Sequence, residues 1–362
     1  MAQALHLAER GLYTTSPNPR VGCVLVQPDK FAGSGKLLAE GWHERAGKAH
    51  AEVHALRAAG AAAKGATAYV TLEPCSHHGR TPPCADALIA AGVARVVIAM
   101  QDPNPQVAGQ GIARLQSAGI EVECGLMEAS ARELNIGFVA RMTRGTPWLR
   151  SKIAMSLDGR TALNNGESQW ITGASARRDG HHWRARSCAV LTGIGTVLAD
   201  NAQLSVREVV TTRQPLRVVL DSQLRMPLDA RILQGGGTLI YTTSKDAQKI
   251  SLLKKAGAEV VVLAAVQGRI DLAACLRDLA ARGCNEVLVE AGFTLNGALL
   301  KAGLIDELVL YMAPQLLGDM ARGMTQLGEL TKLDQRIELE WQDVRSVGRD
   351  LRMVATVKNV TN

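Results

Sequence analysis

Along residues 1–125, segments with the apolar pattern of strands alternate with segments that have the apolar pattern of helices. Short apolar runs, typical of buried strands, lie at 21–27, 67–72, 95–100 and 120–124, and a further strand is expected before His43. Alanine-rich or amphipathic segments, typical of helices, lie between them at 2–13, 51–63, 85–91 and 111–118. Helices that alternate with short strands predict a layered α/β domain. The segment 111–118 is the last helix that this pattern predicts in the first half.

The short polar segment 144–147, which contains Gly145 and Pro147, interrupts the pattern and predicts a domain boundary. Beyond it the alternation resumes. Strands are expected at 148–155, 218–221, 238–242, 259–263, 286–290 and 307–312, and helices at 246–256, 271–282 and 294–302. One domain typically holds about 100–200 residues. The 362 residues are therefore expected to form two domains, 1–145 and 146–362.

Composition excludes several classes of function. The chain is 47% apolar, enough to bury sizeable cores, but only 3% aromatic, which argues against base stacking on many rings. The net charge of +7 is scattered along the chain, a distribution that favours small anionic substrates over nucleic acid. No apolar run reaches the roughly 18 residues of a membrane span, and no signal peptide is evident. We expect a cytoplasmic homo-oligomer without a membrane or nucleic-acid partner.

A histidine, a glutamate and two cysteines in the first half have the pattern of a catalytic zinc site. They are His50 and Glu52, in the sequence His-Ala-Glu, then Cys75 after a proline, and Cys84. Two thiolates and a neutral imidazole suit zinc, and three protein ligands leave one tetrahedral position open to water. Glu52 would move protons to and from that water. This H-x-E…P-C…C arrangement is that of zinc-dependent base deaminases, which hydrolyse a ring amino group.

The local sequence places these residues at the ends of secondary-structure elements. Positions i and i+2 point apart within a helix, so His50 and Glu52 share a site only where an extended segment enters a helix. Cys75 follows a buried strand, and Cys84 follows two prolines that favour a helix start. A closed structural zinc site, with His77 or His78 as fourth ligand, is the alternative reading.

Eight residues separate the two cysteines, where the commoner motif has two. Their hydroxyl, imidazole and guanidinium groups suit a phosphorylated substrate. Five other cysteines are expected to be small core residues in a reducing compartment. They are Cys23, Cys124, Cys188, Cys275 and Cys284.

The second half contains no standard dinucleotide fingerprint. The segment 193–195, Gly-Ile-Gly, is too short and is read as a turn. The segment 290–297 closes an apolar strand and opens a helix, so its backbone N–H groups would suit a pyrophosphate, although an ordinary strand-to-helix turn has the same pattern. Basic residues outnumber acidic ones by 27 to 22 from Thr146 onward, and no acidic residue follows a glycine-rich turn at the NAD spacing. Both features favour NADPH over NADH.

The motifs taken together resemble a known family. The first half contains PNPRVG at 17–22, HAE at 50–52, TLEPCSHHGRTPPC at 71–84 and DPNP at 102–105. The second half contains KIAMSLDGR at 152–160, GESQWIT at 166–172, TVLAD at 196–200 and VEAG at 289–292. Nearly the whole chain is similar to the bifunctional riboflavin-biosynthesis deaminase/reductases. The resemblance implies a cytidine-deaminase-like three-layer α/β/α domain followed by a dihydrofolate-reductase-like α/β domain.

For the first half, the resemblance implies zinc-dependent loss of the 2-amino group of 2,5-diamino-6-(5-phosphoribosylamino)pyrimidin-4(3H)-one. His50, Cys75 and Cys84 would hold zinc, and Glu52 would shuttle protons. The expected substrate contacts are Asn18, His43, His77, Arg80, Asp102 and Asn104.

For the second half, it implies reduction of the ribosyl group to ribityl with NADPH. The cofactor contacts would be Ala154, Trp170, Thr196, Asp200, Ser222 and Gly292, and the substrate contacts Ser168, Arg184, Leu204, Arg207 and Glu290. Arg184 and Arg207 suit a phosphate, although an arginine on a helix more often lies on a solvated face, and Trp170 suits a core equally well. No obvious proton donor for the reduction emerges, and Lys152 and Glu290 are the acid–base candidates.

Three other functions remain compatible with the sequence. A tRNA or nucleoside deaminase would use the same zinc site, yet would leave the second half without a role. A binding protein with a closed zinc site would release no ammonia. A reductase with a silent first half would oxidise NADPH only when given the deaminated substrate.

Overall fold

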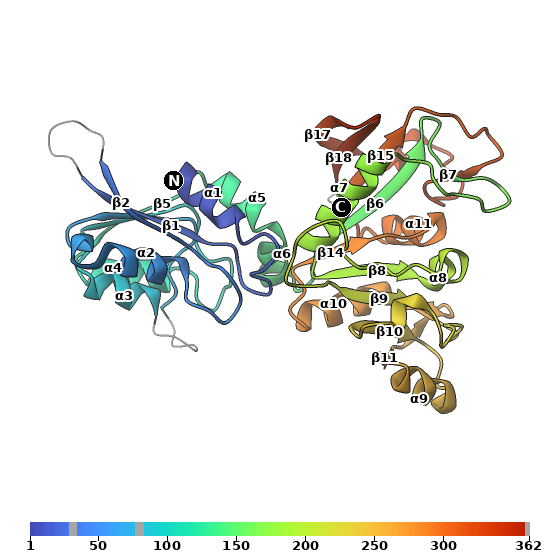
Figure 1. The fold of residues 1–362 in the computed structure, drawn as a ribbon, viewed down its shortest axis with the longest axis horizontal. Helices are drawn as coiled ribbons and strands as arrows, with labels where there is room; N and C mark the ends of the chain where they lie inside the picture. Colours follow the sequence, from blue (N-terminus) through green and yellow to red (C-terminus); the bar gives the residue numbers. More distant parts are fainter. Residues whose placement is uncertain (29–34, 77–82, 359–362) are drawn as a thin grey trace. The chain divides into compact units, whose positions relative to one another are not determined.

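The computed structural model describes residues 1–28, 35–76 and 83–358. It divides into two compact units, Met1–Thr146 and Pro147–Asn362 (Figure 1). The boundary between them falls within the polar segment 144–147 that was expected to join two domains. Each unit is built around its own sheet and its own core. None of the helices in the described part of the chain has both the length and the apolar character needed to cross a membrane.

The first unit contains a five-stranded mixed sheet in the order β2-β1-β3-β4-β5. Its strands are β1 (Gly22–Gln27), β2 (Lys36–Trp42), β3 (Thr67–Val70), β4 (Arg95–Ile98) and β5 (Glu121–Cys124). β1 is antiparallel to both β2 and β3, whereas β3, β4 and β5 are parallel. The carboxyl ends of β3 and β4 therefore lie at the same edge of the sheet, where α/β proteins usually bind ligands.

Helices cover both faces of this sheet (Figure 1). α1 (Ala2–Glu9) and α5 (Glu128–Leu134) lie on one side, and α6 (Ile136–Arg144) follows α5. On the other side lie α2 (Ala51–Ala59), which continues into a 3-10 turn (Gly60–Ala63), α3 (Cys84–Ala90) and α4 (Gln110–Ser117). The predicted layered α/β architecture is thus confirmed for this unit.

Two glycines let helices approach the sheet closely. A Cβ at Gly22 in β1 would lie 1.9 Å from the backbone oxygen of Ala4 in α1. A Cβ at Gly41 in β2 would lie 2.2 Å from the backbone oxygen of Ala51, the first residue of α2. No side chain fits at either place, because real Cβ atoms do not approach other atoms so closely. The first turn of α2 therefore packs closely against β2. This turn contains Glu52 and directly follows His50.

The five strands and the first four helices lie where the sequence predicts them, with ends shifted by a few residues. The prediction that 111–118 is the last helix is wrong, because α5 and α6 follow it. α5 contributes Ala131 and Leu134 to the core, and α6 contributes Phe138, Val139 and Met142. α6 is clearly amphipathic, so the sequence contained a signal for this helix that the prediction overlooked. Cys124 is also exposed, and not a core residue as expected.

The second unit contains a nine-stranded sheet in the order β11-β10-β9-β8-β14-β6-β15-β18-β17. The seven strands from β11 to β15 are parallel, and β18 and β17 add an antiparallel edge. Their bounds are β6 (Trp148–Ser156), β8 (Ala189–Gly193), β9 (Leu216–Leu220), β10 (Thr238–Thr242), β11 (Ala258–Val262), β14 (Glu286–Val289), β15 (Glu307–Ala313), β17 (Leu339–Val347) and β18 (Asp350–Val357). Two small two-stranded sheets pair β7 (Arg160–Ala162) with β16 (Arg322–Gly323), and β12 (Ala265–Val266) with β13 (Arg269–Ile270).

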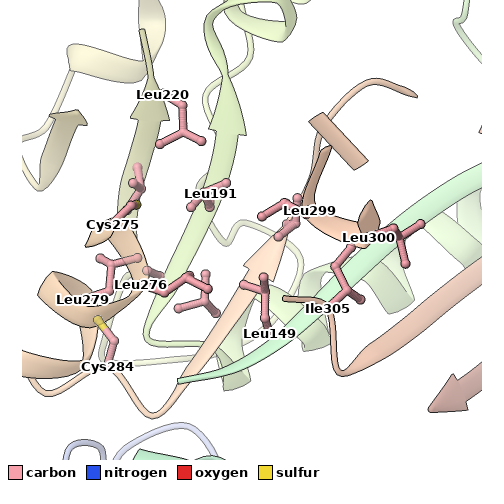
Figure 2. Packing of buried hydrophobic residues seen from close by; sticks show 14 of the residues in the cluster. Leu149, Leu191, Leu220, Cys275, Leu276, Leu279, Cys284, Leu299, Leu300 and Ile305 are labelled. Atoms are coloured by element: carbon pink, nitrogen blue, oxygen red, sulfur yellow. The ribbon is translucent and has the colours of Figure 1, made fainter. Parts of the chain in front are cut away.

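Both faces of the parallel strands are buried, which explains their nearly continuous apolar runs. α10 (Leu272–Ala281) and α11 (Phe293–Lys301) pack on one face, where Leu149, Leu191 and Leu276 belong to one cluster (Figure 2). α7 (Ala174–Arg186), α8 (Ile194–Asp200) and α9 (Ala247–Lys255) contribute to the clusters on the other face. Two 3-10 turns, Arg231–Leu233 and Leu333–Gln335, complete the unit. The second unit is thus also a layered α/β domain, as predicted.

Several elements of the second unit were not predicted, namely α7, β8, α8 and the β17–β18 pair. The reading of 193–195 as a turn is wrong, because Gly193 ends β8 and precedes the first residue of α8. α7 consists mostly of small and charged residues, and its buried positions include Ala176, Gly180 and Ala185. Residues this small leave little hydrophobic periodicity for a sequence to show.

A buried charge cluster joins β6, β14 and β15 near their amino ends. Arg150 pairs with Glu286 and, at 2.7 Å, with Glu307, and all three side chains are at least nine-tenths buried. Arg186 of α7 also reaches Glu286 at 2.7 Å, and the Arg150 guanidinium lies 5.4 Å from the centroid of the Trp183 ring. Burial of the two carboxylates is tolerated because each is paired and hydrogen-bonded.

We predict that Arg150→Ala destabilises the second unit by about 3–5 kcal/mol, since two buried carboxylates would lose their common partner. Four of the five tryptophans, Trp148, Trp170, Trp183 and Trp341, lie in this unit, so fluorescence during urea unfolding reports on it. Arg277→Ala is the control, because the exposed Arg277 forms only a 3.8 Å pair with Asp271. Equal midpoints for the two variants would contradict the prediction.

Candidate functional site

Three potential metal ligands converge in the first unit. The ligand atoms of His50, Cys75 and Cys84 all lie within 4.8 Å of one another. The Nδ1 atom of His50 lies 3.2 Å from the Sγ atom of Cys84 and 3.6 Å from that of Cys75. The backbone N–H of Cys84 donates to the Cys75 sulfur over 3.3 Å. The sequence motif therefore corresponds to one compact group of nitrogen and sulfur donors.

His50 and Cys84 lie where helices begin, as the sequence predicts, and Cys75 lies beyond the end of a strand. His50 has extended backbone angles, φ −79° and ψ 166°, and α2 begins at the next residue. This bend lets His50 and Glu52 face one site although they are two positions apart. Cys84 is the first residue of α3, where the helix dipole favours a thiolate. Cys75 lies in the segment that follows β3.

Glu52 is buried beside these ligands, and its Oε2 atom has no hydrogen-bond partner in the described part of the chain. Burial raises the pKa of Glu52 to about 7. A buried carboxylate oxygen without a partner is costly unless something else fills the place. Glu52 therefore has the burial and the free acceptor atom expected of a proton carrier next to a bound water.

The thiols of Cys75 and Cys84 strongly affect each other's pKa. A hydrogen bond with Cys84 lowers the pKa of Cys75 to about 4, and the bond with His50 acts in the same direction. The hydrogen bond between the two cysteines, together with burial, raises the pKa of the Cys84 thiol. The protein alone thus stabilises one thiolate of the pair, whereas a bound dication would stabilise both.

The donor set fits zinc. One imidazole nitrogen and two sulfurs match the ligand types that zinc prefers, and the partner-free oxygen of Glu52 is available to a water bound beside them. Among the described residues, the group of close donor atoms has three members, which leaves one tetrahedral position open. His77, His78 and Arg80 lie outside the described residues, so their roles as substrate contacts or as a fourth ligand stay predictions.

Asn18 and His43 border the same group. The His43 Nδ1 atom lies 3.0 Å from the backbone oxygen of Ala49, which makes Nδ1 the donor and leaves Nε2, 3.2 Å from the Asn18 Nδ2 atom, as acceptor. The ring centroids of His43 and His50 are 5.3 Å apart. Burial lowers the pKa of His43, which favours the neutral ring. The structure thus brings together two of the six expected substrate contacts of the first half.

Asp102 and Asn104 lie on the loop between β4 and α4. Their Oδ1 atoms accept hydrogen bonds from the backbone N–H groups two residues further on, at 2.8 Å and 3.1 Å. The loop is fixed by Glu73, a buried residue whose function the sequence did not suggest. Its position between a buried strand and Pro74-Cys75 was the available signal, because a glutamate is rarely buried without a purpose.

The second unit contains a cleft of about 1440 Å³ at the carboxyl ends of its parallel strands. All eleven residues predicted for cofactor or substrate in this half line it: Ala154, Ser168, Trp170, Arg184, Thr196, Asp200, Leu204, Arg207, Ser222, Glu290 and Gly292. Pockets for single small ligands usually measure about 300–1,000 Å³. The cleft therefore has room for a dinucleotide together with a second molecule.

Glu290, Arg184 and Lys152 form a charged group in this cleft. Arg184 donates to Glu290 through Nε and through Nη2, the latter at 2.9 Å, and the Lys152 Nζ atom lies 4.0 Å from the Glu290 Oε2 atom. Burial alone would raise the pKa of Glu290, but Arg184 and Lys152 outweigh it and hold the pKa at about 2. Burial lowers the pKa of Lys152. The alternative that Arg184 lies on a solvated face is wrong, because its side chain is only 16% exposed.

Arg207 lies beside this group and is held by His181, a residue that the sequence analysis missed. The backbone N–H of Arg207 donates to the His181 Nδ1 atom over 3.2 Å, and its Nη1 atom donates to the Ser205 Oγ atom over 3.1 Å. Burial and the charges of Arg184 and Arg207 lower the pKa of His181 to about 4, so the ring is neutral. No periodic signal marks His181, because α7 has no clear apolar stripe.

The glycines that line the cleft give it features of a nucleotide site. Gly292 precedes the first residue of α11, whose first N–H groups lack partners within the helix. A Cβ at Gly292 or Gly195 would meet no atom within 4 Å, so open space lies in front of both glycines. These features fit a pyrophosphate and support the first reading of the segment 290–297. Trp170 is 66% exposed, with Arg177 4.5 Å from its ring centroid, so the alternative of a core residue is wrong.

Comparisons with known families assign each half separately. Residues 1–100 match the cytidine and deoxycytidylate deaminase zinc-binding region, and residues 147–353 match the RibD C-terminal domain. The two matches fall on the two compact units of the structure.

Relatives match over nearly the full length. The riboflavin biosynthesis protein RibD of Escherichia coli (strain K12) is 51% identical, over 97% of this chain and 96% of that protein. RibD of Haemophilus influenzae is 45% identical, over 99% and 97%. A structure of Acinetobacter baumannii RibD superposes with a TM-score of 0.91 at 46% identity, covering 99% of this chain and 98% of that one.

A structure from Thermotoga maritima, described as a diaminohydroxyphosphoribosylaminopyrimidine deaminase/5-amino-6-(5-phosphoribosylamino)uracil reductase, superposes with a TM-score of 0.86 at 32% identity. It covers 99% of this chain and 97% of that one. The predicted resemblance and α/β fold class are confirmed. The chain belongs to the RibD family of riboflavin biosynthesis, bifunctional enzymes that combine a zinc-binding deaminase domain with an NADPH-using reductase domain.

Proposed function

We propose that the domain 1–145 hydrolyses the 2-amino group of 2,5-diamino-6-(5-phosphoribosylamino)pyrimidin-4(3H)-one, and that the domain 146–362 reduces the deaminated product. The observation that carries the first proposal is the group of His50, Cys75 and Cys84 with the partner-free oxygen of Glu52 beside it. The Thermotoga maritima relative, which is named as a deaminase and reductase of phosphoribosylamino compounds of this kind, supports the choice of substrates.

His50, Cys75 and Cys84 would hold the zinc ion, which when bound lowers the pKa of a coordinated water toward neutrality. Glu52, through its free Oε2 atom, would take one proton from the attacking water and pass it to the ring nitrogen, and would then take the second proton of the same water oxygen and pass it to the departing amine. Asn18 and the neutral His43 ring supply polar contacts at the same place. Asp102 and Asn104, with His77 and Arg80, complete the proposed substrate contacts.

In the second domain, Ala154, Trp170, Thr196, Asp200, Ser222 and Gly292 would hold NADPH, which supplies a hydride. Ser168, Arg184, Leu204, Arg207 and Glu290 would hold the phosphoribosyl substrate. All of these residues line one cleft, which supports a shared site. Arg184 is already paired with Glu290, so Arg207 is the arginine with more positive charge to offer a phosphate.

Ring opening and reduction of the ribosyl group need a proton as well as a hydride. Glu290 is ionised and accepts two hydrogen bonds from Arg184, so it is a poor proton donor. Lys152 is largely buried, burial lowers its pKa, and its Nζ atom lies 4.0 Å from the Glu290 carboxylate. We therefore assign the proton donor to Lys152, with Glu290 holding it in place.

The partners proposed for the protein are small phosphorylated pyrimidines and not nucleic acid. A homo-oligomer also stays a prediction. The outer strand β17 supports it, because Trp341 and Val344 are more than half exposed on this edge of the sheet. Exposed apolar side chains on an edge strand are a usual feature of subunit contacts.

The proposed ligand set predicts that the protein binds one zinc ion and that Cys75→Ser loses most of it. A hydroxyl group is a harder and weaker ligand for zinc than a thiolate. Cys124→Ser is the matched control, because Cys124 is exposed and lies outside the ligand group. Metal content per chain after gel filtration decides the question. A Cys75→Ser variant that folds and keeps its zinc would remove Cys75 from the set.

We expect Glu52→Gln to keep zinc and to lose deamination by at least about 10²-fold, because glutamine has nearly the same shape but carries no proton between groups. Ammonia release from the diaminopyrimidine phosphate measures the first step. NADPH oxidation with the deaminated substrate should be unchanged and serves as the internal control. Deamination within a few-fold of the wild type would assign the proton transfer to another residue.

A fragment that begins at Thr146 should fold alone, reduce the deaminated substrate and prefer NADPH over NADH. Its compact unit has a separate core, and its excess of basic residues favours a 2′-phosphate. The ratio of kcat/KM for the two cofactors tests the preference. Equal use of NADH would contradict the cofactor assignment, and an insoluble or inactive fragment would contradict the independence of the domain.

A further inference from the structure

Glu73 is a buried carboxylate that binds one loop of the first domain through four backbone N–H groups. Its Oε2 atom accepts from Asp102 at 3.1 Å and from Gly109 at 3.0 Å. Its Oε1 atom accepts from Gly111 at 2.8 Å and from Ile112 at 3.2 Å. In the described part of the chain, its hydrogen bonds come from these backbone groups and no arginine or lysine forms an ion pair with it. The residue is only 5% exposed.

The four N–H groups come from both ends of one loop. Asp102 lies near its start, just beyond β4, and Gly111 and Ile112 lie in the first turn of α4. One carboxylate therefore closes the loop and satisfies N–H groups that the start of α4 leaves without partners. The loop between these anchors contains Asn104. Its conformation thus depends on a side chain from a different part of the chain.

The same contact joins the loop to the segment that carries a metal ligand. Glu73 is two residues before Cys75, and Pro74 between them packs against Gly111 in the first turn of α4, where the loop ends. A Cβ at Gly111 would lie 2.0 Å from the Pro74 backbone oxygen, so the two segments pack without room for a side chain. A shift of the loop would therefore displace the segment that contains Cys75.

We propose that Glu73 is a positioning residue for the deaminase, which fixes the loop of Asp102 and Asn104 in register with the segment of Cys75. The carboxylate touches neither the ligand group nor any reacting atom. It acts through the backbone, by setting where the two loop side chains stand relative to the metal ligands. The substrate role of these two side chains rests on the function proposed above.

The chemistry of the carboxylate makes the inference testable with an isosteric change. Glu73→Gln keeps the shape but replaces one of the two acceptor oxygens with an NH₂ donor. Two of the four N–H groups then face a donor, and the loop end that they anchor is released. Zinc ligation is not altered directly, because Cys75 and its neighbours keep their own contacts.

The first experiment measures zinc content and the kinetics of ammonia release in the full-length enzyme. A hydrogen bond to a charged group is worth about one to two orders of magnitude in an equilibrium constant, so we expect KM for the diaminopyrimidine phosphate to rise about 10- to 100-fold in Glu73→Gln. Zinc content, reductase activity and, within about threefold, kcat should stay at the wild-type level. Glu121→Gln, an exposed change on β5, should leave all values unchanged.

Gly111→Ala perturbs the same contact from the loop side with Glu73 intact, and it should give the same KM increase with full zinc. A double-mutant cycle then tests the route of the effect. If Glu73 acts through the loop, Glu73→Gln combined with Asn104→Ala should raise KM little more than the larger single change. Multiplied effects of the two changes would overturn the inference.

Amide hydrogen exchange separates this inference from the proposed function, because it needs no substrate. Exchange of the segment 102–112 should become at least about tenfold faster in Glu73→Gln than in Glu121→Gln, while the segment 84–90 stays protected. Unchanged exchange together with unchanged KM would overturn the role of Glu73 and leave the deaminase assignment intact. A wild-type enzyme that releases no ammonia would overturn the proposed function, while faster exchange would still support the structural part of the inference.

Discussion

Buried carboxylates need partners, and the two domains are arranged around this constraint. Four glutamates of the described chain are buried, and they differ in the partners of their carboxylates. Glu286 and Glu307 share the guanidinium of Arg150, whereas Glu73 relies on four backbone N–H groups. Glu52 alone among these four keeps an oxygen without a partner. Among the described residues the buried Asp221 and Asp350 also have an oxygen without a hydrogen-bond partner, so the missing partner alone does not mark a site. What distinguishes Glu52 is that its partner-free oxygen belongs to a side chain beside the donor atoms of His50, Cys75 and Cys84.

The sequence predicted the outline of both domains and the metal ligands because these features have local signals. Short apolar runs indicated most strands, and the change from extended backbone to helix at His50 followed from its spacing to Glu52. α7 gave no such signal, since its contacts use mostly small and charged residues, and α8, which buries Ile194 and Val197, is only seven residues long and too short to show a clear period. Their positions depend on the sheet that they cover, which only the folded chain contains.

The supporting residues were beyond the reach of sequence for a different reason. His181 holds Arg207 across 26 positions, and Glu73 holds a loop that begins 29 positions later. His181 belongs to no periodic face or motif, and Glu73 lies within the motif 71–84, where the metal ligands and not Glu73 suggested a chemistry. The resemblance to a family named the residues that are expected to touch ligands, whereas the structure shows which residues hold those side chains in place.

The two reaction sites use charge in opposite ways, and this follows from their chemistry. In the first domain the close sulfur atoms share one thiolate until a dication arrives, so binding of the metal completes the site. In the second domain Glu290 already neutralises Arg184 and lies near Lys152, so that site is largely formed before any ligand enters. A metal centre gains from charges that only the ion can balance. A hydride transfer gains from a rigid cleft, because the positions of two ligands decide its rate.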